Sequence, residues 1–302
     1  MQNFRFYPKK KGEMDNSKMI GSPFEIGYSG WKKILKKVFE RTLEDNVPIV
    51  SAGVAFYAFL AIFPGIIVLF SIYGLAVDSQ SAGEQITMLA EVMPPQTISI
   101  IEGRMENLME TSKSALGWGT VFGVLVAFWS ANKGIKSLFT GLDVTYAVEN
   151  GRGIIKQNAL SLAFTMGTIL VIIVSLGFII LFPVLLNTIG LPGFLGTLVA
   201  WLRWPLLATI VITAISLIYQ YGPARETPRF RWVVLGASVA TAVWLAASWG
   251  FSFYVSNFGN FGEIYGSLSA VVIMLFWLFI SSFIILVGGE LNCATEEYAE
   301  NG

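Results

Sequence analysis

A stretch of 46 residues, Gln157 to Leu202, contains no charged side chain, and this feature limits what the chain can fold into. As one continuous α-helix the stretch would be about 69 Å long, more than twice the hydrocarbon core of a membrane. It therefore has to turn back on itself, and the turn-forming residues between Asn187 and Gly193 mark the place. The sequence predicts two membrane-spanning helices here, near 159–186 and 197–221.

Four further apolar stretches predict membrane-spanning helices in the rest of the chain. The first, Ile49 to Val77, is 29 residues long and free of charge, which exceeds the roughly 20 residues that a helix needs to cross a bilayer. The second is shorter and ends in polar residues. We therefore expect an all-α polytopic membrane protein with six transmembrane helices, near 49–77, 115–136, 159–186, 197–221, 232–256 and 264–289.

The composition agrees with a membrane protein and excludes several classes of chemistry. Hydrophobic residues make up 54% of the chain and charged residues 13%, about half the charged share of a soluble domain. The chain has no His and one Cys, Cys293, which excludes a disulfide framework, Cys/His zinc sites and imidazole catalysis. We expect no enzymatic activity, no cofactor and no bound metal.

The basic residues predict the orientation in the membrane. Of the 20 Lys and Arg residues, 17 lie in the first 48 residues, between the second and third spans, or directly after the fourth. Basic loops stay in the cytoplasm, so both termini are expected there. Residues 1–30 are then a cytoplasmic tail, 78–114 an extracytoplasmic helical segment, and 293–302 an acidic cytoplasmic tail.

Residues 31–44 have the pattern of an amphipathic helix. Apolar residues from Trp31 to Leu43 recur at helical spacing, and lysines occupy the other face. Such a helix lies on an anionic membrane surface. A lipid sensor or a nucleic-acid-binding arm would show the same pattern, but we interpret it as an interfacial helix that fixes the topology, with membrane lipids and no nucleic acid as partners.

The acid at the end of the sixth span, Glu290, is a candidate functional residue because ionisable groups near a bilayer are rare. Lys133, near the end of the second span, is expected at a similar depth. We predict that the two side chains pair at the cytoplasmic mouth of the bundle, with Asn132 and Asn292 supplying hydrogen bonds. The alternative is that both side chains extend independently to the membrane surface.

Four other polar or helix-bending residues are weaker candidates. Tyr57 and Pro64 lie on the first span, where a kinked helix with an inward phenol could line a cavity, although such a Tyr more often bonds a neighbouring helix. Arg203 begins the fourth span and either holds a lipid phosphate or extends toward the headgroups. Tyr221 ends that span at the inner face.

Three separated motifs resemble the YihY/BrkB family of bacterial inner-membrane proteins. They are the stretch from Asp45 to Pro64, the segment from Phe128 to Tyr146, and the ending from Tyr265 to Asn292. The resemblance covers roughly residues 31–292. Where a typical member has Ser and often a second Pro around the Pro64 kink, this chain has Ala61 and Gly65, so a hydroxyl-based role there is not expected.

The resemblance implies a six-helix protein anchored in the cytoplasmic membrane. Proposals for relatives include transport, lipid export and resistance to host killing, and some members carry an old label of ribonuclease BN. A metal-dependent nuclease needs clustered His and Asp ligands, and this chain has no His. We therefore reject the nuclease and expect a transporter or exporter of a lipid or another amphiphilic substrate. The alternative is a non-catalytic membrane scaffold or envelope-integrity factor.

Overall fold

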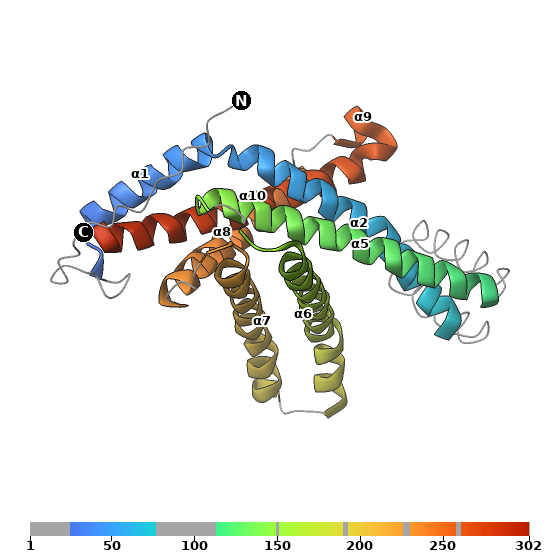
Figure 1. The fold of residues 1–302 in the computed structure, drawn as a ribbon. Helices are drawn as coiled ribbons and strands as arrows, with labels where there is room; N and C mark the ends of the chain where they lie inside the picture. The colour runs from blue at the N-terminus through green and yellow to red at the C-terminus, as the bar shows by residue number, and fades with distance from the viewer. Residues whose placement is uncertain are drawn as a thin grey trace. The chain divides into compact units, whose positions relative to one another are not determined.

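The computed structural model describes residues 25–76, 113–148, 151–189, 193–225, 230–257 and 261–301, and all regular elements in these ranges are helices (Figure 1). The protein is therefore all-α in its described part, as predicted. The chain divides into two compact units, one formed by residues 1–56 and 134–302 and the other by residues 57–133. Each unit is described by itself.

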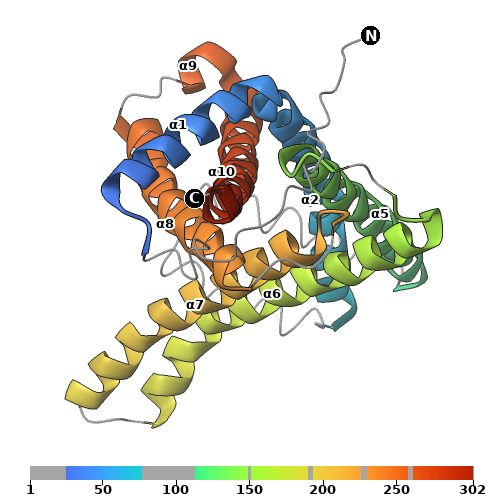
Figure 2. The same cartoon turned by 60° about the vertical axis from the view of Figure 1, so that its left-hand side comes forward.

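The helices follow one another along the chain with short connections. Their bounds are α1 Tyr28–Glu44, α2 Val47–Ala76, α5 Lys113–Thr145, α6 Ile154–Ile189, α7 Gly193–Tyr221, α8 Phe230–Asn257, α9 Phe261–Tyr265, the short 3-10 helix η2 Gly266–Leu268, and α10 Ser269–Asn301. The long charge-free stretch is divided as predicted, because α6 ends and α7 begins on either side of residues 190–192. Figure 2 shows α6 and α7 as an antiparallel pair.

Five of these helices are long and apolar enough to cross a membrane, which makes the chain a polytopic membrane protein. The apolar segments are Val47–Pro64, Ile154–Ser175, Trp204–Tyr221, Phe230–Asn257 and Ser269–Glu300. The second predicted span, 115–136, lies within α5, whose described residues contain no apolar segment that meets the same criterion. That span stays a prediction, and the count of six with it.

Both ends of the last long helix differ from the sequence prediction. The last long helix begins at Ser269, five residues later than expected, because α9 and η2 precede it and Gly266 takes a φ of +54°, a left-handed value that interrupts the helix. It then continues to Asn301, so the residues predicted as an acidic tail form its last turns. Residues 1–24 and 77–112 lie outside the described residues. They contain most of the predicted amino-terminal tail and most of the predicted extracytoplasmic segment.

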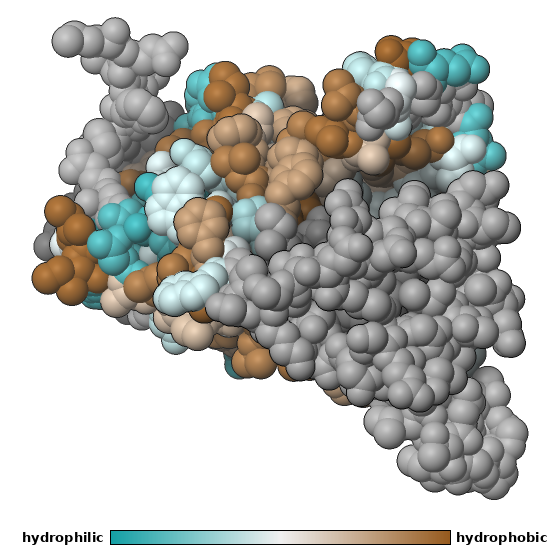
Figure 3. Space-filling model, turned by 90° about the vertical axis from the view of Figure 1, so that its right-hand side faces the viewer, coloured by the Kyte–Doolittle hydropathy of each residue, from teal (hydrophilic) through white to brown (hydrophobic). Residues whose placement is uncertain are grey.

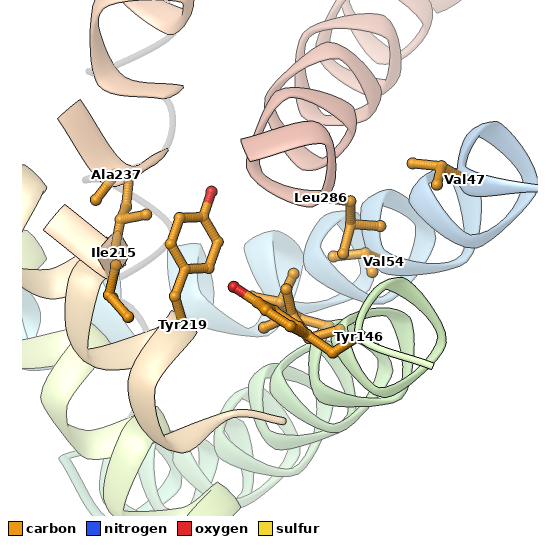
Figure 4. Packing of buried hydrophobic residues seen from close by; sticks show 10 residues of the cluster. Val47, Val54, Tyr146, Ile215, Tyr219, Ala237 and Leu286 are labelled. Atoms are coloured by element: carbon orange, nitrogen blue, oxygen red, sulfur yellow. The ribbon is translucent and has the colours of Figure 1, made fainter. Parts of the chain in front are cut away.

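The core of the first unit forms around α10. α10 packs against α8 and α1, while α7 packs against α8 and α6. Side chains from five helices meet in one buried cluster, including Leu142 of α5, Tyr219 of α7 and Leu286 of α10, none of which keeps any exposed surface (Figure 4). Because lipid is as apolar as these side chains, close packing rather than exclusion from water holds the helices of this cluster together.

The outward faces of the long helices remain apolar. Ile173 of α6, Trp201 of α7 and Trp249 of α8 are 61%, 70% and 74% exposed. Figure 3 shows apolar side chains uncovered on the described part of one face. Large apolar surfaces on long helices are stable in hydrocarbon rather than in water, which agrees with a location in the membrane.

The second unit contains the later turns of α2 and the first turns of α5. α2 runs through Pro64 as one helix, with Phe59 and Phe63 packed edge to face at 5.0 Å between ring centroids. On α5 the Lys133 ammonium lies 5.6 Å from the centroid of the Trp129 ring, within the range of a cation–π interaction.

Candidate functional site

α1 and the last turns of α10 face each other through a stripe of charged side chains. Lys37 and Arg41, one turn apart on α1, both bind Glu297 of α10, with nitrogen–oxygen distances of 2.6 and 2.7 Å. Arg41 also donates a hydrogen bond to the sulfur of Cys293, one turn earlier on α10, at 3.2 Å. The residue numbers rise on one helix as they fall on the other, so the two helices are antiparallel here (Figure 1).

The stripe continues to the corner between α1 and α2. Asp45 follows the last residue of α1, and its backbone N–H donates to the carbonyl of Arg41 at 2.8 Å. Asn46 then takes a φ of +51°, a left-handed conformation that Asn tolerates better than most residues. This turn places the half-buried Asp45 side chain beside α10, and burial raises the pKa of its carboxyl above the ordinary value.

Glu290 lies at the same level on α10 and is completely buried. Neither of its carboxyl oxygens has a hydrogen-bond partner of good geometry among the described residues. Asp45, Arg41 and Thr145 are the groups placed to act on this carboxyl, and the Thr145 hydroxyl donates to the carbonyl of Gly141 in its own helix at 3.0 Å. A buried acid without a bound cation is costly in its ionised form.

A second group of partly or fully buried side chains also lies beside α10. Arg225, in the segment after α7, binds Glu296 at 2.6 Å, and its guanidinium lies over the Tyr146 ring, 3.9 Å from the centroid. Burial raises the pKa of Tyr146 above its ordinary value. The Tyr146 hydroxyl and the Arg225 Nε are buried and have no hydrogen-bond partner among the described residues.

Polar contacts with α7 and α8 hold α10 in place. Asn292 is fully buried, and its Oδ1 accepts a hydrogen bond from the backbone N–H of Gly236 on α8 at 2.9 Å. The Tyr219 hydroxyl of α7 donates to the carbonyl of Ile285 at 2.6 Å. Gly236 and Gly288 allow this close approach, because a Cβ atom at either position would collide with Asn292 or Tyr219.

Two of the residues predicted from the sequence, Glu290 and Asn292, belong to this charged and polar network on α10. The Asn292 amide binds α8, whereas the sequence predicted that it would support a Glu290–Lys133 pair. Lys133 belongs to the second unit, as do Asn132, Tyr57 and Pro64. The Glu290–Lys133 pair therefore stays a prediction.

The remaining predicted residues lie on α7. Tyr221 is the last residue of that helix and is 42% exposed. Its carbonyl, like that of Gly222, accepts a hydrogen bond from Arg152, at 2.9 and 2.8 Å respectively, so Arg152 caps the end of the helix. Arg203 lies within α7, but its side chain is outside the described residues.

Sequence reasoning missed most of the network, although its spacing carries a signal. Residues 37, 41 and 45 recur every four positions, and residues 290, 293 and 297 recur at intervals of three and four. Each set therefore lies along one face of a helix. Two such stripes of complementary charge indicate a helix pair, but neither stripe indicates which helix is its partner.

The network contains acids that can bind a proton. No group of three His, Cys, Asp or Glu side chains that could hold a metal ion occurs within the part of the chain that the structure describes. The sulfur of the single cysteine, Cys293, accepts a hydrogen bond from Arg41. The carboxyl groups of Asp45 and Glu290 are the groups in the network that can exchange a proton.

Comparison with known proteins places this network in a family. Residues 38–302 match the family model described as virulence factor BrkB. The chain belongs to the BrkB family. The matched range includes Arg41, Asp45 and the whole of α10, so the BrkB region contains most of the network.

Individual relatives agree with this membership. A Bacillus subtilis protein named as ribonuclease-like, YfkH, is 28% identical over 266 residues, which cover 85% of this chain and 93% of the relative. A UPF0761 membrane protein of Alkalilimnicola ehrlichii is 27% identical over 85% of this chain and 53% of the relative. Another, of Alteromonas mediterranea, is 25% identical over 87% of both. No solved structure matches the BrkB chain.

Proposed function

We propose that this BrkB protein is a transporter or exporter that moves a lipid or another amphiphile, and that it works in the bacterial inner membrane with both termini in the cytoplasm. It acts by changing conformation and catalyses no covalent reaction. Membrane lipids are its partners and nucleic acid is not.

The observation that carries this proposal is the burial of Glu290. A fully buried carboxyl group with two unpartnered oxygens lowers the stability of a protein that only has to stay folded. Within a membrane protein such a group is by default functional. Its two charge states favour different packing of the surrounding helices, and a transporter needs two arrangements of this kind. A static scaffold needs one.

The outer face of α1 supports contact with lipid. Ile34 and Val38 of α1 are buried in a cluster with residues of α10, but Leu35, Phe39 and Leu43 are 58%, 66% and 58% exposed. These three residues form a stripe that the rest of the described chain leaves uncovered, and exposed lysines lie beside it. An apolar stripe edged by lysines fits an anionic lipid surface.

The proposal excludes the ribonuclease suggested by the name of the Bacillus subtilis relative. RNA hydrolysis by a metalloenzyme requires an activated water held by several ligands, commonly His and Asp, and this chain has no His. Purified protein free of contaminating nuclease should leave RNA intact. Cleavage that is lost on mutation of the protein's own acidic residues would contradict this part of the proposal.

The test of transport uses purified protein in liposomes that contain fluorescent phosphatidylglycerol, phosphatidylethanolamine or lysophospholipid. The readout is the rate at which the probe crosses the bilayer, measured by chemical quenching of the outer leaflet. We expect faster crossing of at least one probe than in protein-free liposomes, and a changed rate for Glu290→Gln. Glu300→Gln is the matched control, because Glu300 is an exposed acid on the same helix.

The alternative function predicts a different result. A scaffold or envelope-integrity factor would leave every probe at the rate of protein-free liposomes, with and without a pH or sodium gradient. Glu290→Gln would then behave like the Glu300→Gln control. That combination would contradict the transporter and favour the scaffold.

A further inference from the structure

The facing stripes of α1 and α10 have one more acid than they have cations. Lys37 and Arg41 supply two positive charges, and both bind Glu297. Asp45 and Glu290 form no ion pair with any described residue. With all three acids ionised the group would carry one net negative charge in a buried place. A single proton on the Asp45–Glu290 pair makes the group neutral.

The geometry gives that proton a defined position. Arg41 contacts Cys293, and Asp45 and Glu290 each lie one turn farther along the two antiparallel helices, which places their carboxyl groups beside each other. Two carboxylates that share a site do not both ionise readily. Neither Glu290 oxygen has a hydrogen-bond partner of good geometry among the described residues. A proton held between the two carboxyl groups therefore satisfies an otherwise unpaired buried acid and the half-buried acid at the corner.

We propose that Asp45 and Glu290 form a proton-binding site, in which one proton shared between the two carboxyl groups keeps α1 docked against α10. Release of the proton leaves two adjacent carboxylates, one at the end of α1 and one on α10. Their repulsion acts between the end of α1 and α10, where the chain turns into α2. The site is independent of which molecule the protein moves, or whether it moves one.

The surrounding groups are consistent with one exchangeable proton. α1 contributes Arg41 and the exposed Glu44, and α5 contributes Thr145, whose hydroxyl already donates to its own helix. The other titratable or charged groups near the site or its neighbour Cys293 are Glu297 of α10, Arg225 bound to Glu296, and Tyr146, which follows α5. Tyr219 of α7 lies near Tyr146, and its hydroxyl donates to the Ile285 carbonyl. No cluster of three metal-ligating side chains occurs among the described residues, which favours a proton over a metal ion.

The single cysteine provides a direct test. Cys293 is only partly exposed, and its sulfur accepts a hydrogen bond from Arg41, so the thiol becomes more accessible when α1 leaves α10. Full-length protein in nanodiscs is labelled with a maleimide between about pH 5 and pH 8, and each rate is divided by that of the denatured protein at the same pH. Opening linked to release of one proton should raise the normalised rate by up to about tenfold per pH unit.

Variants separate proton binding from general effects of pH. Glu290→Gln and Asp45→Asn each leave at most one ionisable carboxyl in the pair, so both should remove the pH-dependent increase. Glu300→Gln should keep the wild-type profile. Hydrogen–deuterium exchange of residues 28–44, corrected for intrinsic exchange rates, should follow the labelling. If Glu290→Gln does not fold, Asp45→Asn at the half-buried corner still gives the comparison.

Two results would overturn the proposal. One is a labelling profile for Glu290→Gln and Asp45→Asn that is parallel to the wild-type profile, with α1 exchange independent of pH. The other is a labelling rate that sodium ions, added at constant pH, lower as strongly as acid does. The second result would identify a cation site in place of a proton site.

Discussion

The side-chain oxygen of Asn292 accepts a hydrogen bond from the backbone N–H of Gly236 at 2.9 Å, which joins α10 to α8 inside the buried part of the protein. A helical N–H normally binds a carbonyl in its own helix. This bond is therefore a tertiary contact between two helices, and it requires a residue without a side chain at position 236.

Gly236→Ala should destabilise the protein by about 2 kcal/mol, since the added Cβ would collide with the Asn292 amide and separate α10 from α8. The midpoint of thermal unfolding in detergent is the measurement. Gly250→Ala is the control on the same helix, because a Cβ there meets no atom within 4 Å, and its midpoint should stay equal or rise slightly. Equal losses in both variants would mean that the contact has no special role.

Tyr219→Phe should lower stability by about 1 kcal/mol, because it removes the hydroxyl that donates to the Ile285 carbonyl at 2.6 Å. The same substitution at Tyr221, two residues later and 42% exposed, should change stability by less than about 0.5 kcal/mol. Unfolding curves of the two variants against wild type give the comparison. A neutral Tyr219→Phe would show that another donor replaces the hydroxyl.

Arg225→Met should cost roughly 2 kcal/mol, since it leaves Glu296 without its cation. The cost is below that of a fully buried pair because the two side chains remain 17% and 19% exposed. Adding Glu296→Gln should recover part of the loss. Lys36→Met, in an exposed ion pair with Glu40, should be nearly neutral. A double variant no more stable than Arg225→Met would argue against coupling between the two charges.

Asp143→Asn should change how stability depends on pH. Burial raises the pKa of Asp143, although the Ala224 N–H, 2.7 Å away, and Arg152 lower it. The folded protein then holds this proton more tightly than the unfolded chain, so the stabilisation is present below the ordinary pKa and is lost as pH rises through the folded pKa. Relative to wild type, Asp143→Asn should gain stability as pH rises from the ordinary pKa of an Asp through the raised pKa of the folded state.

A control variant distinguishes the pH-dependent gain in stability of Asp143→Asn from a general effect of removing an acid. Glu40→Gln removes an exposed acid on α1, and its stability should run parallel to wild type across the same range. If Asp143→Asn also ran parallel to wild type, or lost stability with rising pH, the direction of the Asp143 shift would be wrong.

The candidate site was partly accessible from the sequence. Glu290 and Asn292 were identified because polar residues at the end of an apolar span are unusual, and both are fully buried. The residues that act on Glu290 were not identified. Arg41 and Asp45 are about 250 positions away in the chain, and depth in the membrane suggested Lys133 instead.

The sequence by itself determined that the protein lies in a membrane and is built of helices, because hydrocarbon offers no partner for backbone groups and only long apolar helices satisfy them internally. It also located the break between α6 and α7. The tertiary structure decided that α1 lies along α10, so that Arg41 meets Glu297, 256 residues later. Local spacing fixes which side chains share a helix face, but the helix on which that face packs depends on the combined shape and charge of all its neighbours.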